Sequence, residues 1–357
     1  MNEVVHVNPF VKETVRVFPP QNRYGMFRYD MNENPEGLPK SFVDSVLSEI
    51  TPEFLSIYPE PDRFLHKYAT FLGVKFENLM CTNGSDMAIR YLLETFGEVG
   101  KEVVTVAPSF EMYWVNCKIL GYRHVPVSYE PDLTINVDKI LTAITEDTRI
   151  VVLLNPNNPI GNVYSEEEFD QIRKRAEDVG ALVIVDEAYH YFYSKTFLDR
   201  ALRAPNVVVL RTFSKLMSLA ALRLGVIIGN PQLVAEVRKA RLTFDVNAVA
   251  LLFAERLIDR KEIIEELISI QNEGKEYILA ELRSKGYWCR DCCGNFIFIK
   301  TNGDAHVVAR RLEMEKRVLV HPYGNALLKD LIRVSTGSKH AMECFLKAFF
   351  EIDGGER

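Results

Sequence analysis

The chain has 357 residues, of which 47% are hydrophobic and 26% are charged, so it is long enough for two domains or for one large and one small domain. Its net charge is −6 and no block is rich in lysine and arginine, which gives no electrostatic support for binding nucleic acid or an anionic membrane. The apolar runs at 150–154 and 181–185 are far shorter than the roughly 20 residues that span a bilayer, and the N-terminus lacks the pattern of a signal peptide. We therefore expect a cytoplasmic protein that acts on small molecules.

The six cysteines are too few and too scattered for a disulfide framework in a chain of this length. Cys289, Cys292 and Cys293 form a C-x-x-C-C cluster, but no second cysteine or histidine pair lies beside it at the spacing of zinc ligands. We interpret these cysteines as reduced structural thiols rather than metal ligands or redox groups, and we expect no metal.

The first 40 residues lack clean periodicity and contain several prolines, which predicts an extended arm with turns. Residues 41–50 have helical spacing, and a rigid turn at 57–62 precedes another helical stretch that ends at 72.

From residue 78 the pattern alternates between strands and helices. Strands are predicted at 79–82, 102–106, 149–154, 181–185, 207–210 and 224–229. They are nearly continuous apolar runs, as expected when helices cover both faces of a sheet. Because strands joined by helical crossovers form mainly parallel sheets, we predict a three-layer α/β fold.

After residue 229 the regular alternation ends. Helices are predicted at 231–242, from 247 to about 285, at 305–315 and from 339, and strands at 295–300, 317–320 and 331–335. This mixture predicts a smaller α+β domain that the N-terminal arm completes. We assign residues 40–260 to the large domain, and 1–39 with 261–357 to the small domain.

The stretch at 207–215 places a lysine at the mouth of a buried strand, where open α/β sheets bind their ligands. Thr212 and Ser214 precede Lys215, and Arg223 follows it by eight residues. Hydroxyls and a guanidinium suit a phosphate monoester, and a lysine amine can condense with an aldehyde. The combination points to pyridoxal phosphate, although a surface lysine beside an ordinary serine explains this stretch equally well when it is taken alone.

Other predicted strand ends carry the groups that a pyridine ring needs. The Asp186 carboxylate would face the ring nitrogen and keep it protonated. Tyr189 and Asn158 would donate hydrogen bonds to the ring oxygen, and Phe110 would stack on the ring. Taken alone, Asp186 is more often a helix cap, Asn158 a turn residue and Phe110 a core residue.

The first strand of the series leads into Gly84, Ser85 and Asp86. These residues open a helix, whose free N–H groups and dipole suit a phosphate. A plain helix start is the alternative. Suitable residue types at five successive strand ends make coincidence the weaker explanation.

Five motifs together resemble one family. They are NPNNPIG at 155–161, DEAY at 186–189, TFSK at 212–215, LRLG at 222–225 and IRVS at 332–335. With them the chain resembles the class I and II aminotransferases of fold type I, from about residue 15 to the C-terminal helix. NENP at 32–35, YPEP at 58–61 and NGSD at 83–86 are most similar to the histidinol-phosphate aminotransferase branch.

The resemblance implies roles for the matching residues. Lys215 would be the Schiff-base lysine and Asp186 the partner of the pyridinium. The phosphate would be held by the backbone of Ser85 and Asp86 and by Thr212, Ser214 and Arg223. Tyr58 would reach the phosphate in the partner subunit, which implies a homodimer with shared active sites. Arg333 would clamp the substrate α-carboxylate bidentately, although a surface ion pair is the ordinary role of such an arginine.

The chain departs from the histidinol-phosphate aminotransferases at two positions that bind the substrate phosphate in that branch. Pro20 stands where a tyrosine of the arm is expected, and His321 stands where an arginine is usual. A desolvated phosphate needs paired charge, and a histidine is only partly protonated near neutral pH. Met87 and Ile160 depart from the family as well, outside the assigned catalytic groups.

We therefore predict an aminotransferase that moves an amino group between an amino donor and a carbonyl acceptor, with histidinol phosphate as a poor or absent substrate. A decarboxylase of the same fold, similar to the threonine-phosphate decarboxylases, is the alternative enzyme. A regulator that binds an amino acid without turnover is the alternative outside enzymes, although such regulators usually carry a DNA-binding domain, which this chain has no room for.

Overall fold

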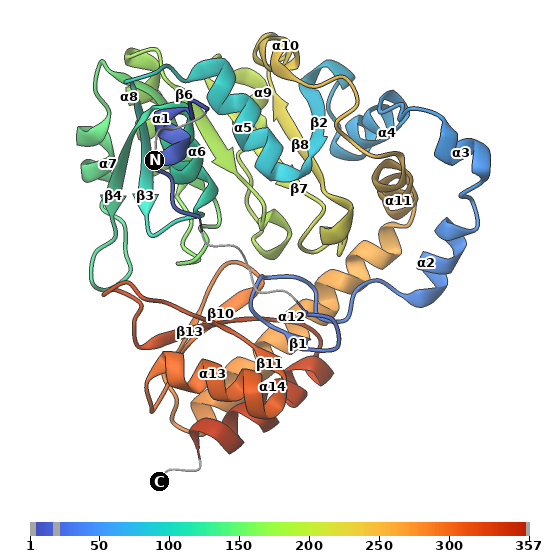
Figure 1. Cartoon of the computed structure of the whole chain (residues 1–357), viewed down its shortest axis with the longest axis vertical. Coiled ribbons are helices and arrows are strands. Elements are labelled where there is room, and N and C mark those ends of the chain that lie inside the picture. The colour runs from blue at the N-terminus through green and yellow to red at the C-terminus, as the bar shows by residue number, and fades with distance from the viewer. Residues whose placement is uncertain (1–4, 17–21, 355–357) are drawn as a thin grey trace.

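The computed structural model describes residues 5–16 and 22–354 and divides the protein into a large sheet layer and a smaller one, joined by a long helix (Figure 1). Pro20, which the sequence marks as a departure in the arm, lies outside the described residues.

The larger sheet has seven strands in the order β2-β8-β7-β6-β5-β3-β4. They are β2 (Leu79–Asn83), β3 (Glu102–Ala107), β4 (Arg123–Ser128), β5 (Thr148–Leu154), β6 (Leu182–Asp186), β7 (Val207–Thr212) and β8 (Leu224–Gly229). All pairings are parallel except those of β8, which is antiparallel to both β2 and β7. The strands β2, β3, β5, β6 and β7 consequently run in one direction and end at one edge of the sheet.

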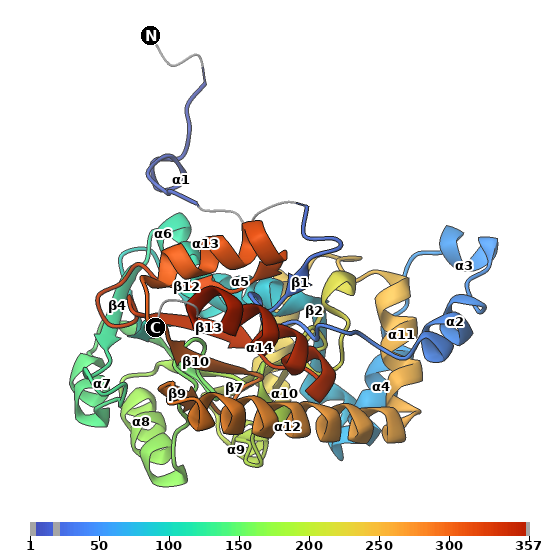
Figure 2. The ribbon, with the colours of Figure 1, turned by 90° about the horizontal axis from the view of Figure 1, so that it is seen from below.

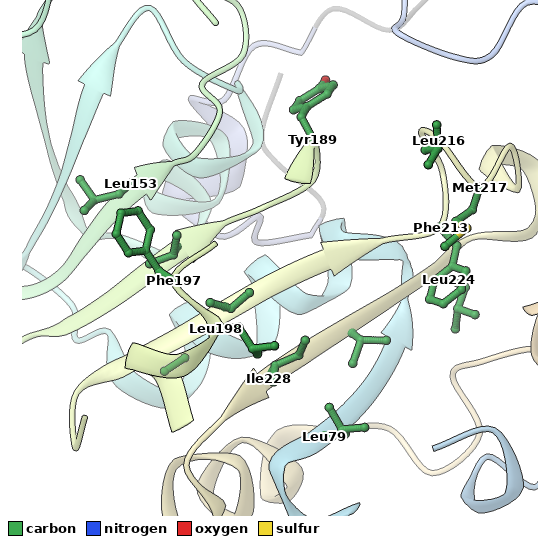
Figure 3. Packing of buried hydrophobic residues seen from close by; sticks show 14 of the residues in the cluster. Leu79, Leu153, Tyr189, Phe197, Leu198, Phe213, Leu216, Met217, Leu224 and Ile228 are labelled. Atoms are coloured by element: carbon green, nitrogen blue, oxygen red, sulfur yellow. The ribbon is translucent and has the colours of Figure 1, made fainter. Parts of the chain in front are cut away.

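Helices cover both faces of this sheet. They are α4 (Asp62–Leu72), α5 (Gly84–Phe96), α6 (Met112–Leu120), α8 (Glu166–Asp178), α9 (Leu198–Arg203), α10 (Pro231–Ala240) and α11 (Ala248–Ile258). Buried residues of α5, α6 and α10 pack with one face, and those of α4, α8, α9 and α11 pack with the other. In β7 the side chains of Val207 and Val209 enter one core while Val208 and Leu210 enter the other, which explains the unbroken apolar run. Figure 3 shows part of the first core, to which β5 contributes Leu153 and β8 contributes Ile228. The predicted three-layer α/β fold is confirmed.

The smaller part is built on a second core. Its four-stranded sheet has the order β12-β13-β10-β9, from β9 (Cys289–Asp291), β10 (Phe296–Lys300), β12 (His321–Pro322) and β13 (Leu331–Ser335). The helices α12 (Lys261–Ser284), α13 (Ala305–Lys316) and α14 (Lys339–Asp353) pack with it (Figure 2). The arm joins this part where β1 (Phe27–Arg28) pairs in parallel with β11 (Val318–Leu319). The predicted domain limits, residues 40–260 and the remainder, stay a prediction.

The sequence missed several elements. The remaining helices are α1 (Pro9–Lys12), α2 (Lys40–Leu47), α3 (Pro52–Ser56) and α7 (Val137–Ala143). Of these only α2 was expected. The strand β4 was missed because it lies at the sheet edge, contains Pro126 and buries only Val127 fully. The single long helix expected from 247 to 285 is wrong: the chain breaks at Asp259 and Arg260, and Arg260 has non-helical dihedral angles (φ −116°, ψ 65°).

Within residues 5–16 and 22–354, no helix is long and apolar enough to cross a membrane. All six cysteines are unpaired thiols.

Candidate active site

Lys215 lies just beyond the end of β7, at the edge where the parallel strands terminate. Its Nζ donates a hydrogen bond of 2.9 Å to the Met31 carbonyl oxygen and lies 5.7 Å from the centre of the Tyr189 ring. Burial, together with the positive charge of Arg333, lowers the pKa of the Lys215 amine to about 8. Roughly a tenth of the amine is therefore unprotonated at pH 7, far more than at the ordinary pKa of 10.5, and this fraction can act as a nucleophile.

Asp186, the last residue of β6, is a buried carboxylate. Its Oδ2 accepts a hydrogen bond of 2.9 Å from the Tyr113 hydroxyl, and its Oδ1 accepts one of 3.1 Å from the Ala188 N–H. Burial raises the pKa of Asp186 to about 6 in spite of these two donors. Among the described residues Asp186 forms no ion pair, although the charge of Lys215 lowers its pKa to some extent, and a positively charged group bound beside it would stabilise its ionised form.

The segment that follows Asp186 is held by a buried ion pair. Glu187 accepts hydrogen bonds of 3.1 and 2.9 Å from Nε and Nη2 of Arg211 on β7, and one of 2.7 Å from the Phe197 N–H. Both charged side chains are almost fully buried, at 0% and 6% exposure. Because such a pair is costly to break, it fixes the chain that carries Asp186 and Tyr189 against the neighbouring strand.

Two glycines let the backbone and a guanidinium approach each other at the start of α5. Gly84 has φ +73°, and a Cβ atom there would lie 2.5 Å from Nη2 of Arg223. A Cβ on Gly225 would lie 2.6 Å from the Ser85 nitrogen. The residue before α5, Asn83, makes no side-chain cap, so the side chains leave the first N–H groups of the helix available to a ligand.

Hydroxyls and a guanidinium complete this cradle. Thr212 Oγ1 donates to Ser214 Oγ at 3.0 Å, and Arg223 Nη1 donates to the same oxygen at 3.3 Å. Arg223 Nη2 also pairs with the Asp86 carboxylate at 2.9 Å, where both side chains are about two-fifths exposed. These residues and the helix N-terminus together match the donor set of a phosphate site.

Arg333 reaches across from the small sheet to the large one. Its Nη1 donates a hydrogen bond of 2.5 Å to Asn158 Oδ1, and its Nη2 donates one of 2.6 Å to the Asp30 carbonyl oxygen. The guanidinium lies 5.6 Å from the centre of the Phe296 ring and 6.0 Å from that of Tyr323, while its buried Nε has no protein partner. A buried guanidinium without a carboxylate partner suits a carboxylate ligand.

His321 lies directly opposite Arg333 in the pairing of β12 with β13, so both side chains project from the same face of the sheet. The residue as a whole is exposed, but its ring packs edge-on against Tyr323, with 4.6 Å between the ring centres. Desolvation of the ring, followed by the neighbouring Arg333 and His306 side chains, lowers the pKa of His321 below its usual value. The imidazole is therefore neutral at neutral pH, a stronger departure from a fixed cation than the partial protonation that the sequence suggested.

Two other expected residues are aromatic, and their proposed roles stay predictions. Tyr58 is 71% exposed and stacks on Phe244, with 4.3 Å between the ring centres. Phe110 follows β3 and is half buried against the core beside α5 and α6.

Sequence reasoning missed Tyr113, Asn32 and Tyr323. Tyr113 comes three residues after Phe110, so helical spacing could have placed it toward the same edge. Asn32 belongs to the quoted NENP motif but was given no role. Its amide donates a hydrogen bond of 2.9 Å to the Tyr189 hydroxyl, a contact between residues 157 positions apart that no local pattern indicates.

Comparison with known proteins identifies the family. Residues 30–349 match the model of the family described as aminotransferase class I and II. Histidinol-phosphate aminotransferase from Aquifex aeolicus is 34% identical over 331 residues, which cover 91% of this chain and 92% of that protein. The enzyme of the same name from Clostridium novyi is 31% identical over 340 residues, which cover 93% and 94%.

Among solved structures, histidinol-phosphate aminotransferase from Sinorhizobium meliloti in complex with pyridoxal-5'-phosphate superposes with a TM-score of 0.89 over 98% of both chains, at 22% identity. This likeness concerns the fold. The family match and the sequence relatives cover nearly the whole chain, and the chain belongs to the class I and II aminotransferases.

Proposed function

We propose that the site binds pyridoxal phosphate and transfers an amino group between an amino acid and a carbonyl acceptor. The observation that carries the proposal is the position of Lys215, whose lowered-pKa amine lies near Tyr189 at the edge shared by the buried Asp186 and the Gly84–Arg223 cradle. When bound, the cofactor supplies an electron sink for the substrate carbon.

The donor set fits this group at both ends. Asp186 would face the ring nitrogen, and a protonated nitrogen there would provide a cation for the buried carboxylate. Thr212, Ser214, Arg223 and the first N–H groups of α5 would hold the phosphate. The donated bond from Arg333 occupies Asn158 Oδ1, so the amide nitrogen of Asn158 is the group left to donate to the ring oxygen beside Tyr189.

The chain's own residues perform the remaining steps. Arg333 binds the α-carboxylate and so orients the bond at the α-carbon, since Asn158 and the Asp30 carbonyl hold its guanidinium in place. The Lys215 amine would serve as the acid-base group that takes the proton from the substrate α-carbon.

A homodimer with shared sites is part of the proposal. The exposed Tyr58 belongs to a group of outward-facing apolar side chains that would be in contact with water in a monomer. They are Leu55 (66% exposed), Ile57 (54%), Tyr58 (71%), Leu242 (63%) and Phe244 (54%). This surface supports a partner subunit, to whose phosphate site Tyr58 would extend.

The substrate that we propose is an amino acid or amine without a phosphate. His321 is neutral and Arg333 serves the α-carboxylate, so these two positions offer a phosphate no further fixed charge. Pro20 points in the same direction by its residue type alone.

Two measurements test the proposal. Replacing Lys215 with alanine should abolish both the visible absorption band of the holoprotein and all turnover. A panel of amino donors, followed by loss of that band, should show efficient donors among unphosphorylated amino acids and slow turnover of histidinol phosphate. A Lys215→Ala protein that transaminates normally would disprove the mechanism, and histidinol phosphate among the best donors would disprove the substrate assignment.

A further inference from the structure

The arm crosses the active site at Asn32, which makes a hydrogen bond with every polar group it has. Its N–H donates to Ser335 Oγ at 2.8 Å, and its carbonyl oxygen accepts from Asn295 Nδ2 at 3.0 Å. Its Oδ1 accepts from Ser335 Oγ at 3.3 Å, and its Nδ2 donates to the Tyr189 hydroxyl at 2.9 Å. Asn32 is 0% exposed, and its three partners are 3% exposed or less.

The Asn32 amide presents its nitrogen to Tyr189 and its oxygen to Ser335. Ser335 Oγ accepts the backbone N–H of Asn32 and donates its own proton to Asn32 Oδ1, so this one hydroxyl bonds both the backbone and the side chain of Asn32. In this orientation both ends of the amide are hydrogen-bonded.

The amide nitrogen is a donor only, so the Tyr189 oxygen must accept from it. A phenol that accepts one hydrogen bond still has a proton of its own to donate, and that proton cannot point back at Asn32. The direction left to it is the space on the other side of the phenol oxygen, within the site.

The backbone of Asn32 serves the neighbouring lysine as well. Asn32 has φ +55°, a left-handed conformation that asparagine adopts more readily than other non-glycine residues. The carbonyl just before it, that of Met31, accepts the hydrogen bond from Lys215 Nζ. The four hydrogen bonds of Asn32 to buried groups therefore also hold the backbone that presents this carbonyl to the lysine.

We propose that Asn32 is a positioning residue that holds the Tyr189 hydroxyl as a hydrogen-bond donor toward the cofactor ring oxygen. Asn32 touches neither reacting atom and acts through Tyr189. The inference rests on the proposed cofactor site. It adds to that site the residue that makes the Tyr189 hydroxyl a hydrogen-bond donor toward the cofactor.

The test uses the pH titration of the visible band of the purified holoenzyme. A hydroxyl that donates to the ring oxygen stabilises the form of the cofactor in which that oxygen carries negative charge, so losing the donor raises the midpoint of the titration. In Asn32→Asp the new carboxylate accepts the phenol proton and reverses the bond. We expect the midpoint to rise by about one pH unit or more, as for the loss of a hydrogen bond to a charged group.

Asn34→Asp is the matched control, since it places the same charge two residues away in the same arm. Asn34 donates to Ser218 Oγ at 2.8 Å and to the Gly37 carbonyl at 3.1 Å, so its replacement leaves Tyr189 untouched. We expect a midpoint near that of the wild type.

A second variant, Asn32→Gly, removes the amide without adding charge and tolerates the left-handed backbone. We expect Asn32→Gly to raise the midpoint less than Asn32→Asp does. In a protein that already carries Tyr189→Phe, Asn32→Gly should leave the midpoint unchanged. An equal rise with and without the phenol, or no rise in either Asn32 variant, would overturn the inference. A wild-type protein whose visible band does not respond to amino donors would instead contradict the proposed function.

Discussion

The two walls of the active site are built in different ways. On the large sheet, Asp186 and Lys215 stand at the ends of adjacent parallel strands, whose register is fixed by apolar residues buried on both faces. On the small side, Arg333 and His321 come from short antiparallel strands, and Asn32 comes from an arm 303 residues before its partner Ser335. The first wall carries the groups proposed to contact the cofactor. The second carries Arg333 and His321, proposed for the substrate, and Asn32, which acts on the cofactor through Tyr189.

The comparison suggests that chemistry and selectivity occupy separate parts of the chain. A wall of strand ends is rigid and holds charges in a dry environment, as reaction chemistry requires. A wall of short strands and an arm can change residue types without disturbing the sheet. His321, which departs from the family at a position proposed for the substrate, lies on the small-side wall, whereas the departures on the large-sheet side, Met87 and Ile160, lie outside the assigned catalytic groups.

The strongest test of the cofactor wall is Asp186→Asn. Removing one partner of a buried ion pair costs about 3–5 kcal/mol, so we expect turnover to fall by roughly 10² to 10⁴. Single-turnover rates with a good amino donor measure the effect. Asp199→Asn is the control, because Asp199 is a 74% exposed carboxylate on α9 paired with Arg203. Turnover that survives in Asp186→Asn would remove the carboxylate from the mechanism.

On the substrate wall the largest effect should come from Arg333→Lys. A lysine keeps the charge but loses the fork that binds Asn158, the Asp30 carbonyl and a carboxylate together. Losing a hydrogen bond to a charged group costs about 1.5–3 kcal/mol, which predicts a fall in kcat/KM of roughly 10- to 100-fold. The visible band should stay, since the large-sheet wall is intact. Loss of the band with unchanged kcat/KM per holoenzyme would reverse the assignment of the two walls.

Gly84→Ala probes the cradle of the cofactor wall. The added Cβ would displace the Arg223 guanidinium, and we expect the cofactor to bind about tenfold more weakly or worse, by equilibrium titration of the cofactor-free protein. Gly73→Ala is a matched control, because Gly73 has φ +69° and nothing within 4 Å of an added Cβ. Both variants carry the backbone strain of a left-handed residue, about 1–2 kcal/mol, but only the first touches the cradle. Equal cofactor affinities in the two variants would refute the role of the close approach.

The same division explains what the sequence could predict. The strand ends at Asn158, Asp186 and Lys215 follow apolar runs, so local pattern was enough to group them on one edge. The contacts of Asn32 with Tyr189 and Ser335 depend on folding the arm back over the sheet, which leaves no periodic signal. The hydrogen bond from Tyr113 to Asp186 could be predicted only by knowing how α6 is rotated about its axis.

The fold shows the same limit. The core strands were found because both their faces are buried, whereas β4 was missed because only one of its residues, Val127, is fully buried. The break at 259–260 was also missed, because the apolar pattern continues across it while the chain changes direction.

A smaller effect is expected from His321→Arg, which tests selectivity on the substrate wall. A guanidinium is always charged and binds phosphate in a bidentate manner, so this variant should use histidinol phosphate better than the wild type does, by roughly tenfold in kcat/KM. His306→Arg, on α13 beside it, is the comparison for a charge added nearby. A gain for phosphorylated and unphosphorylated donors alike would show that His321 does not select the substrate.

The smallest effect concerns the pH dependence of stability in the cofactor-free protein. Burial raises the pKa of Asp186 from 3.8 to about 6, so between these values the folded state binds more protons than the unfolded state. Its contribution to the free energy of unfolding must therefore fall as pH rises through this window. Lys215, lowered from 10.5 to about 8, has the opposite sign: the unfolded state binds more protons between these values, and stability rises with pH there.

Differences between variants isolate the two contributions from the other titrating groups. Urea unfolding at several pH values should show that Asp186→Asn removes the loss of stability on the acid side, and that Lys215→Met removes the gain on the alkaline side. Adding pyridoxal phosphate to the wild type should weaken the acid-side loss, because a cation beside Asp186 lowers its pKa toward the unfolded value. If the free energies of unfolding of the wild type and Asp186→Asn changed in parallel from pH 4 to 6, the Asp186 carboxylate would not be desolvated in the folded protein. It would then gain no special stabilisation from the proposed protonated ring nitrogen.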